Sequence, residues 1–84
     1  MIREYIAAAM QRAKYEILDE DHSYYGEIPE CQGVWANART LEECRSELES
    51  VLEDWLLVGI SLHHTLPVID GIDINKVYTE PIAA

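Results

Sequence analysis

Positive charge is scarce in this sequence. Among its 84 residues, six are Lys or Arg and 16 are Asp or Glu, which gives a formal net charge of −10. Proteins that bind nucleic acids neutralise phosphates with clustered Lys and Arg side chains, but here no two basic residues are adjacent. The composition therefore argues against direct binding of DNA, RNA or an anionic membrane. It favours a basic protein partner, because opposite charges steer association, although the charge could equally serve solubility alone.

Long apolar runs and cysteines are also few. No apolar run reaches the roughly 18 residues that a membrane helix needs, and residues 1–6 lack the basic start and apolar core of a signal peptide. The two cysteines, Cys31 and Cys44, match no zinc-binding or redox spacing. We therefore expect a cytoplasmic protein in which both thiols are reduced and partly buried.

Residues suited to catalysis or metal binding do not cluster. His22 follows three acidic residues, but neighbouring side chains in a turn diverge and rarely converge on one ion. His63 and His64 are consecutive and cannot share one face of a helix. The four glycines form no phosphate-binding loop. We therefore predict no catalytic residue, no metal and no cofactor, and we expect that the chain is not an enzyme.

Alternation of apolar and polar residues predicts a small antiparallel sheet. Residues 13–17 and 24–28 alternate with period two on either side of a polar turn, which is typical of a β-hairpin. Residues 34–38 predict a third short strand, with Trp35 on the face opposite its neighbours. Residues 68–74 alternate again and predict a possible short fourth strand at an edge.

Helical spacing appears before and after these strands. Residues 2–12 predict a short helix, since apolar residues recur there every three or four positions. Thr40 followed by Glu43 is a capping box at the start of a second, longer helix. That helix is amphipathic, and Gly59 either ends it or lies inside it if it continues to His63. Its apolar positions are Leu41, Cys44, Leu48, Val51, Leu52, Trp55 and Leu56.

Taken together, these elements predict an α+β fold in one domain. A short helix precedes a three-stranded antiparallel meander, which packs on one long amphipathic helix. The domain is expected to span residues 1–74, with residues 75–84 as a C-terminal arm or tail.

Three stretches, Tyr24–Glu30, Gly33–Ala36 and Ala38–Cys44, together with Leu66-Pro67, resemble the N-terminal domain of the HicB antitoxin family over roughly residues 13–70. The resemblance implies a partial ribonuclease H-like fold without that fold's catalytic machinery. It also implies a partner, the small basic HicA-type ribonuclease toxin. The residues after the domain are too few for the DNA-binding segment of many family members, so we do not expect operator binding.

The leading hypothesis is thus an antitoxin-like protein that binds and neutralises a small basic toxin. Carboxylates would face the basic partner, and an exposed aromatic side chain would anchor it. The alternative is a stand-alone oligomeric structural or regulatory module without a toxin, which self-associates through strand edges and the apolar residues Ile69, Ile72, Ile74, Val77 and Ile82. A homo-oligomer fits both. The candidate partner-binding residues are Tyr25, Glu27, Glu30, Trp35, Glu42 and Glu49.

Overall fold

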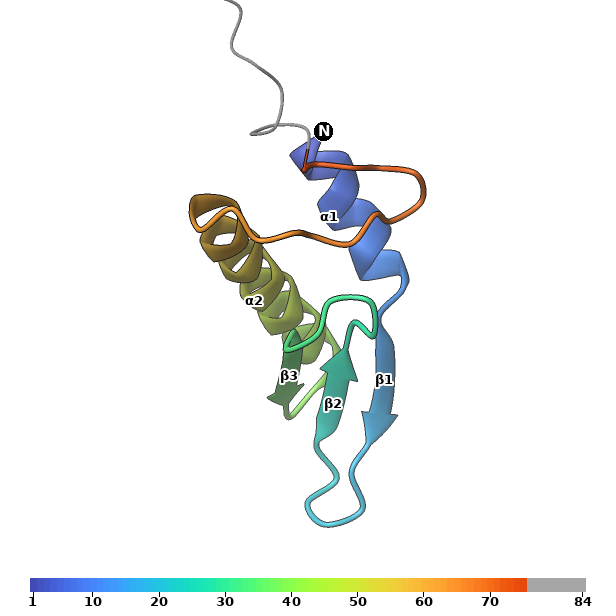
Figure 1. The fold of residues 1–84 in the computed structure, drawn as a ribbon. Coiled ribbons are helices and arrows are strands. Elements are labelled where there is room, and N and C mark those ends of the chain that lie inside the picture. Colours follow the sequence, from blue (N-terminus) through green and yellow to red (C-terminus); the bar gives the residue numbers. More distant parts are fainter. Residues whose placement is uncertain (76–84) are drawn as a thin grey trace, which may run out of the picture.

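The structure, a computed structural model, describes residues 1–75 and has the predicted α+β architecture. Two helices and three strands follow one another in the predicted order, and α2 lies across one face of the sheet (Figure 1). The segment after α2 returns toward α1, and residues 63–75 of it are called the strap below. The elements are α1 (Ile2–Gln11), β1 (Lys14–Ile17), β2 (Tyr24–Glu27), β3 (Trp35–Ala38) and α2 (Leu41–Ser61).

Among the described residues, the strands form one antiparallel sheet in the order β1-β2-β3, as the meander prediction required. Because side chains alternate between the faces of a strand, the pairing sorts them into rows. On the face toward α2 the rows are Tyr15–Gly26–Ala36 and Ile17–Tyr24–Ala38. On the opposite face, called the outer sheet face below, they are Lys14–Glu27–Trp35 and Glu16–Tyr25–Asn37.

The core lies between the sheet and α2. Leu48, Leu52 and Leu56 recur on one side of α2 and are buried, as their spacing predicted. The strand side of this contact is close at Gly26, because a Cβ there would lie 2.8 Å from the Tyr15 ring and 3.1 Å from the Cys44 sulfur. Gly26 therefore lets the first turns of α2 approach the sheet more closely than any larger residue would allow.

The beginning and end of α2 have separate causes. The Thr40 hydroxyl oxygen accepts a hydrogen bond from the Glu43 backbone N–H at 3.1 Å, and the hydroxyl donates to the Glu43 carboxylate. This confirms Thr40 as the N-cap. The Glu43 carboxylate bonds to the Thr40 hydroxyl, whereas in a capping box it would bond to the Thr40 backbone N–H. Gly59 lies inside the helix, facing Leu66, and the helix ends at Ser61. His63, with φ of 56°, turns the chain away in the left-handed region.

The strap does not extend the sheet. The possible fourth strand over residues 68–74 is replaced by a tight turn closed by one bridge between Ile69 and Ile72. The turn forms because Asp70 and Gly71 both take positive φ, which ends an extended strand. The Asn75 side-chain amide closes the strap on Leu66 through two hydrogen bonds of 2.8 Å. Its oxygen accepts from the Leu66 backbone N–H, and its nitrogen donates to the Leu66 carbonyl.

The strap contributes apolar side chains to the core. Ile69 and Ile74 are buried and Ile72 is packed against them. Ile69 and Ile74 therefore belong to the core of the chain and are not available for self-association as the alternative expected, whereas Ile72 is only partly buried. Val77 and Ile82, and all but the first residue of the predicted arm over residues 75–84, lie outside the described residues.

Candidate protein-binding surface

The outer sheet face is not covered by either helix, and it carries an aromatic pair in which Trp35 is exposed and Tyr25 is half-buried. Trp35 is 55% exposed, although it is flanked in the chain by the buried Val34 and Ala36. Its ring stacks on Tyr25 of the neighbouring strand, with ring centroids 6.1 Å apart and planes at 26°. Trp35 therefore lies on the face opposite Val34 and Ala36, as the strand pattern predicted. Such a pair offers a large, rigid contact area at low cost in side-chain entropy.

Carboxylates surround the aromatic pair. Glu27 lies between Lys14 and Trp35 in one cross-strand row, and Glu16 lies next to Tyr25 in the other. The Tyr25 hydroxyl donates a hydrogen bond of 3.4 Å to the Glu27 carboxylate. Partial burial, together with the charges of Glu27 and Glu16, raises the pKa of the Tyr25 phenol, so the phenol stays neutral and keeps its proton to donate.

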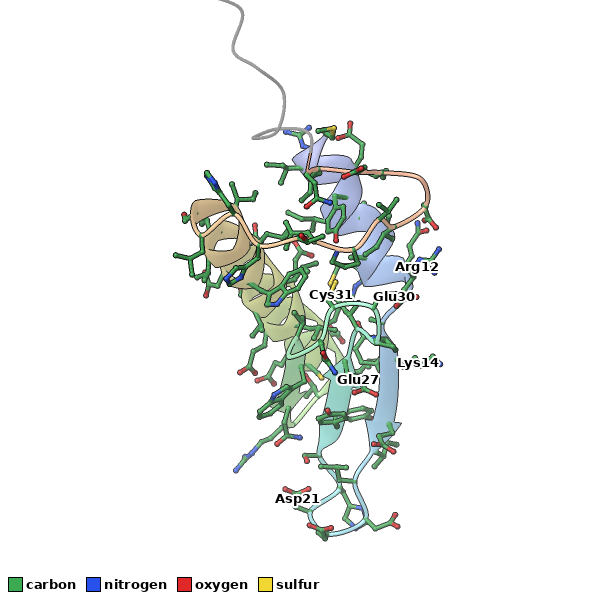
Figure 2. The ribbon with its side chains drawn as sticks, in the orientation of Figure 1. Arg12, Lys14, Asp21, Glu27, Glu30 and Cys31 are labelled. Atoms are coloured by element: carbon green, nitrogen blue, oxygen red, sulfur yellow. The ribbon has the colours of Figure 1, made fainter. Side chains whose placement is uncertain are left out.

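Glu30 has a different role, because it is already paired within the chain. Its carboxylate accepts a hydrogen bond of 2.9 Å from Arg12, whose guanidinium also pairs with Asp70 of the strap. The bond from Arg12 lowers the pKa of Glu30. Figure 2 shows Arg12 and Glu30 side by side where α1 passes into β1, above Glu27. Arg12 thus joins the β2–β3 connection to the strap.

Glu42 and Glu49 are exposed on α2, which covers the face of the sheet opposite the outer sheet face. They line a shallow groove of about 350 Å³ together with Arg45 and Glu53. Glu42 and Glu49 are separated from the outer sheet face because α2 packs on the other face of the sheet. One flat interface cannot include both these carboxylates and the Tyr25–Trp35 pair.

The six predicted residues therefore divide among three places. Tyr25, Glu27 and Trp35 form one surface, Glu30 belongs to an ion-pair cluster, and Glu42 and Glu49 lie on α2. The prediction omitted Lys14 and Glu16, which the hairpin register brings into the same rows as Glu27 and Tyr25. The signal was in the sequence, because period-two alternation already placed Lys14 and Glu16 on the face opposite Tyr15.

Other kinds of site find less support in the part of the chain that the structure describes. No group of three or more His, Cys, Asp or Glu side chains is placed to hold a metal ion within residues 1–75. Cys31 and Cys44 are free and fully buried, and burial raises the pKa of both thiols, which disfavours a nucleophilic thiolate. In residues 1–75, no helix is sufficiently long and apolar to span a membrane.

Comparison with known proteins agrees with this fold. The model of a family described as UPF0150-like matches residues 4–67. Among solved structures, that of TTHA0281 from Thermus thermophilus is similar, with a TM-score of 0.80 and 44% sequence identity, over 87% of this chain and 90% of that chain. No curated protein matches. The family match includes α1 from Glu4 onward, all three strands and the whole of α2.

Proposed function

Because the chain belongs to the UPF0150-like family, we propose that it is a protein-binding module, and specifically a HicB-type antitoxin. In this proposal it binds and neutralises a small basic ribonuclease of the HicA type in the cytoplasm and catalyses no reaction itself. The outer sheet face is the surface that makes the contact.

The observation that carries the proposal is the Tyr25–Trp35 pair, in which Trp35 is exposed, with Glu16 and Glu27 beside it. Tryptophan and tyrosine are the residue types most often found at binding hot spots, where neighbouring polar groups exclude water from the contact. A core role would have buried Trp35, as it buries Ala36 next to it. A basic toxin would place Lys or Arg side chains over the carboxylates and against the aromatic faces.

Net charge supports the same kind of partner. At a net charge of −10, the chain attracts a basic protein over distances of about 8 Å at physiological salt. Attraction at this range raises the rate of encounter, whereas the aromatic contact determines how long the complex lasts. The two contributions can therefore be separated by experiment.

A growth assay tests the proposal. We expect a small basic protein to be encoded next to this chain; that protein is induced alone and then together with the chain, and growth is recorded. We expect the basic protein to stop growth and the chain to restore it. Trp35→Ala should lose the rescue, because it removes the exposed half of the aromatic pair without touching the core.

Leu41→Ala is the matched control, since Leu41 is also an exposed apolar residue, at 46%, but lies on α2. It should rescue growth as well as the unaltered chain does. If the unaltered chain fails to rescue, the antitoxin proposal is wrong, and the stand-alone module becomes the better account. If Trp35→Ala rescues fully, the antitoxin role survives but the outer sheet face is not its binding surface.

A further inference from the structure

The two halves of α2 differ in chemistry. Six acidic residues lie between Glu42 and Asp54, whereas the stretch from Trp55 to Leu62 contains no charged residue. In that second half, Leu57, Val58 and Leu62 are 65%, 55% and 62% exposed. A helix that is apolar on all sides is normally buried on all sides. Here the sheet, α1 and the strap cover only part of it.

The exposed apolar surface has a groove and a ridge. The groove, of about 370 Å³, lies between α1 and α2, and among the described residues that line it Glu53 alone is charged. Next to it on α2, the exposed side chains of Val58 and Leu62 lie four residues apart and form a row, called the ridge below. The groove is lined by Ile2, Ile6, Glu53, Leu56, Leu57, Ile60 and Ser61, and a more open hollow beside it is lined by Leu57, Val58, Ser61 and Leu62.

The strap does not cover the groove. The Tyr5 hydroxyl donates a hydrogen bond of 2.7 Å to the Pro67 carbonyl, which fixes the strap over the Tyr5 side of α1. Successive residues of a helix are rotated by 100° about its axis, so Ile2 and Ile6 are rotated from Tyr5 by about 60° and 100° in the same direction. These two side chains therefore lie on a different side of α1 from Tyr5. On α2 the strap contacts Gly59 through Leu66, whereas the groove is on the Leu57 side. Within residues 1–75, the groove and the ridge therefore remain open and lie side by side on one surface.

We propose that this surface, composed of the groove and the ridge, is a homodimer interface in which a second copy of the chain supplies the occupant. Because the groove and the ridge lie side by side on one helix, two-fold symmetry can place the ridge of each copy opposite the groove of the other. The Val58–Leu62 ridge of each copy then enters the groove of the other, and Leu57 of both copies lies near the axis.

The distribution of charge favours a second copy of the chain over a basic protein as the occupant of this surface. Two chains of −10 repel one another wherever their carboxylates meet, so they can associate closely only through a face that has almost none. The second half of α2 is such a face, with Glu53 at its margin. A basic protein would gain nothing from its charge there, because the carboxylates that could orient it lie elsewhere. The inference does not depend on the proposed antitoxin role.

Sedimentation equilibrium of the isolated full chain tests the proposal. At concentrations up to about 100 μM, we expect a mass of twice the 9.6 kDa chain. Leu57→Glu should raise the dimer dissociation constant at least about tenfold, because it brings two carboxylates together at the axis. Leu57 is exposed, so the fold should persist, which circular dichroism can verify. Leu41→Glu, an equal change at the acidic end of the same helix, should leave the dimer intact.

Cross-linking locates the contact independently. Ser61→Cys should give a covalent dimer with a short bis-maleimide, whereas Ser46→Cys on the acidic half should not; the native thiols are buried and do not compete. A monomeric unaltered chain would overturn the proposal, whether the groove is then empty or filled by residues 76–84 of the same chain. A dimer that Leu57→Glu leaves unchanged would overturn it equally.

Discussion

At the scale of single residues, the buried thiol of Cys31 makes the stability of the fold depend on pH. The thiol is fully buried, and burial raises its pKa to about 11. Tyr5, packed in the same cluster, also has a raised pKa, mainly because of burial and then because of Cys31. Both groups are therefore neutral in the folded protein at physiological pH. Neutrality is what allows them to remain in an apolar core.

The raised pKa of Cys31 predicts a loss of stability in alkaline solution. Below the pKa of the unfolded chain, which is near 9, the thiol is protonated in both states and its contribution is complete. As the pH rises toward 11, the unfolded chain ionises first and is favoured. We expect the free energy of unfolding, measured in urea, to fall by on the order of 2 kcal/mol from this group.

Cys31→Ala is the control, because it removes the titrating group while keeping a small apolar side chain. Its unfolding free energy should be lower at neutral pH, owing to the lost sulfur contacts, but should change less between about pH 9 and pH 11. An equal alkaline loss in both proteins would show that Cys31 is not its source.

At the scale of elements, α2 and the strands follow from local sequence. Thr40 and Glu43 mark the helix start, and the spacing of Leu48, Leu52 and Leu56 marks its buried side. The loss of charged residues after Asp54 is equally visible in the sequence. It was missed because residues 41–56 were treated as one amphipathic pattern. The strands were located by alternation, and each is only four residues long, which limits edge-to-edge pairing by β1 and β3.

The strap was not predictable in this way, because long-range contacts determine its course. Tyr5 bonds to Pro67 across 62 residues, and Arg12 pairs with Asp70 across 58. No local pattern indicates such pairs. The alternation in residues 68–74 predicted a strand, but Gly71 and the positive φ of Asp70 produce a turn. The same limit applied to Glu30, whose pairing with Arg12 depends on where α1 ends.

The N-cap of α2 can be tested by Thr40→Ala. The substitution removes the oxygen that accepts from the Glu43 N–H, and such caps contribute about 1 kcal/mol. We expect the free energy of unfolding to decrease by roughly that amount in urea titrations. Thr65→Ala is the matched control, since Thr65 is exposed and lies beyond the helix. Equal effects of the two substitutions would contradict a specific role for the cap.

At the scale of the whole molecule, the two proposed interfaces lie on different sides. The outer sheet face points away from α2, whereas the groove and ridge are formed by α1 and the second half of α2. Dimerisation therefore leaves both outer sheet faces open, and a dimer should bind two basic partners. Apart from Glu53 at the margin of the groove, the acidic residues of the first half of α2 join neither contact and contribute through long-range attraction.

The most direct test of this account is the affinity of the basic partner for variants on the two sides of the molecule. Glu27→Lys and Glu42→Lys change the net charge equally, but Glu27 is on the outer sheet face and Glu42 is on α2. Isothermal titration at low and moderate salt should show binding weakened at least about tenfold by Glu27→Lys, or about 1.4 kcal/mol, and much less by Glu42→Lys. Equal losses, or a larger loss for Glu42→Lys, would show that the partner does not bind the outer sheet face.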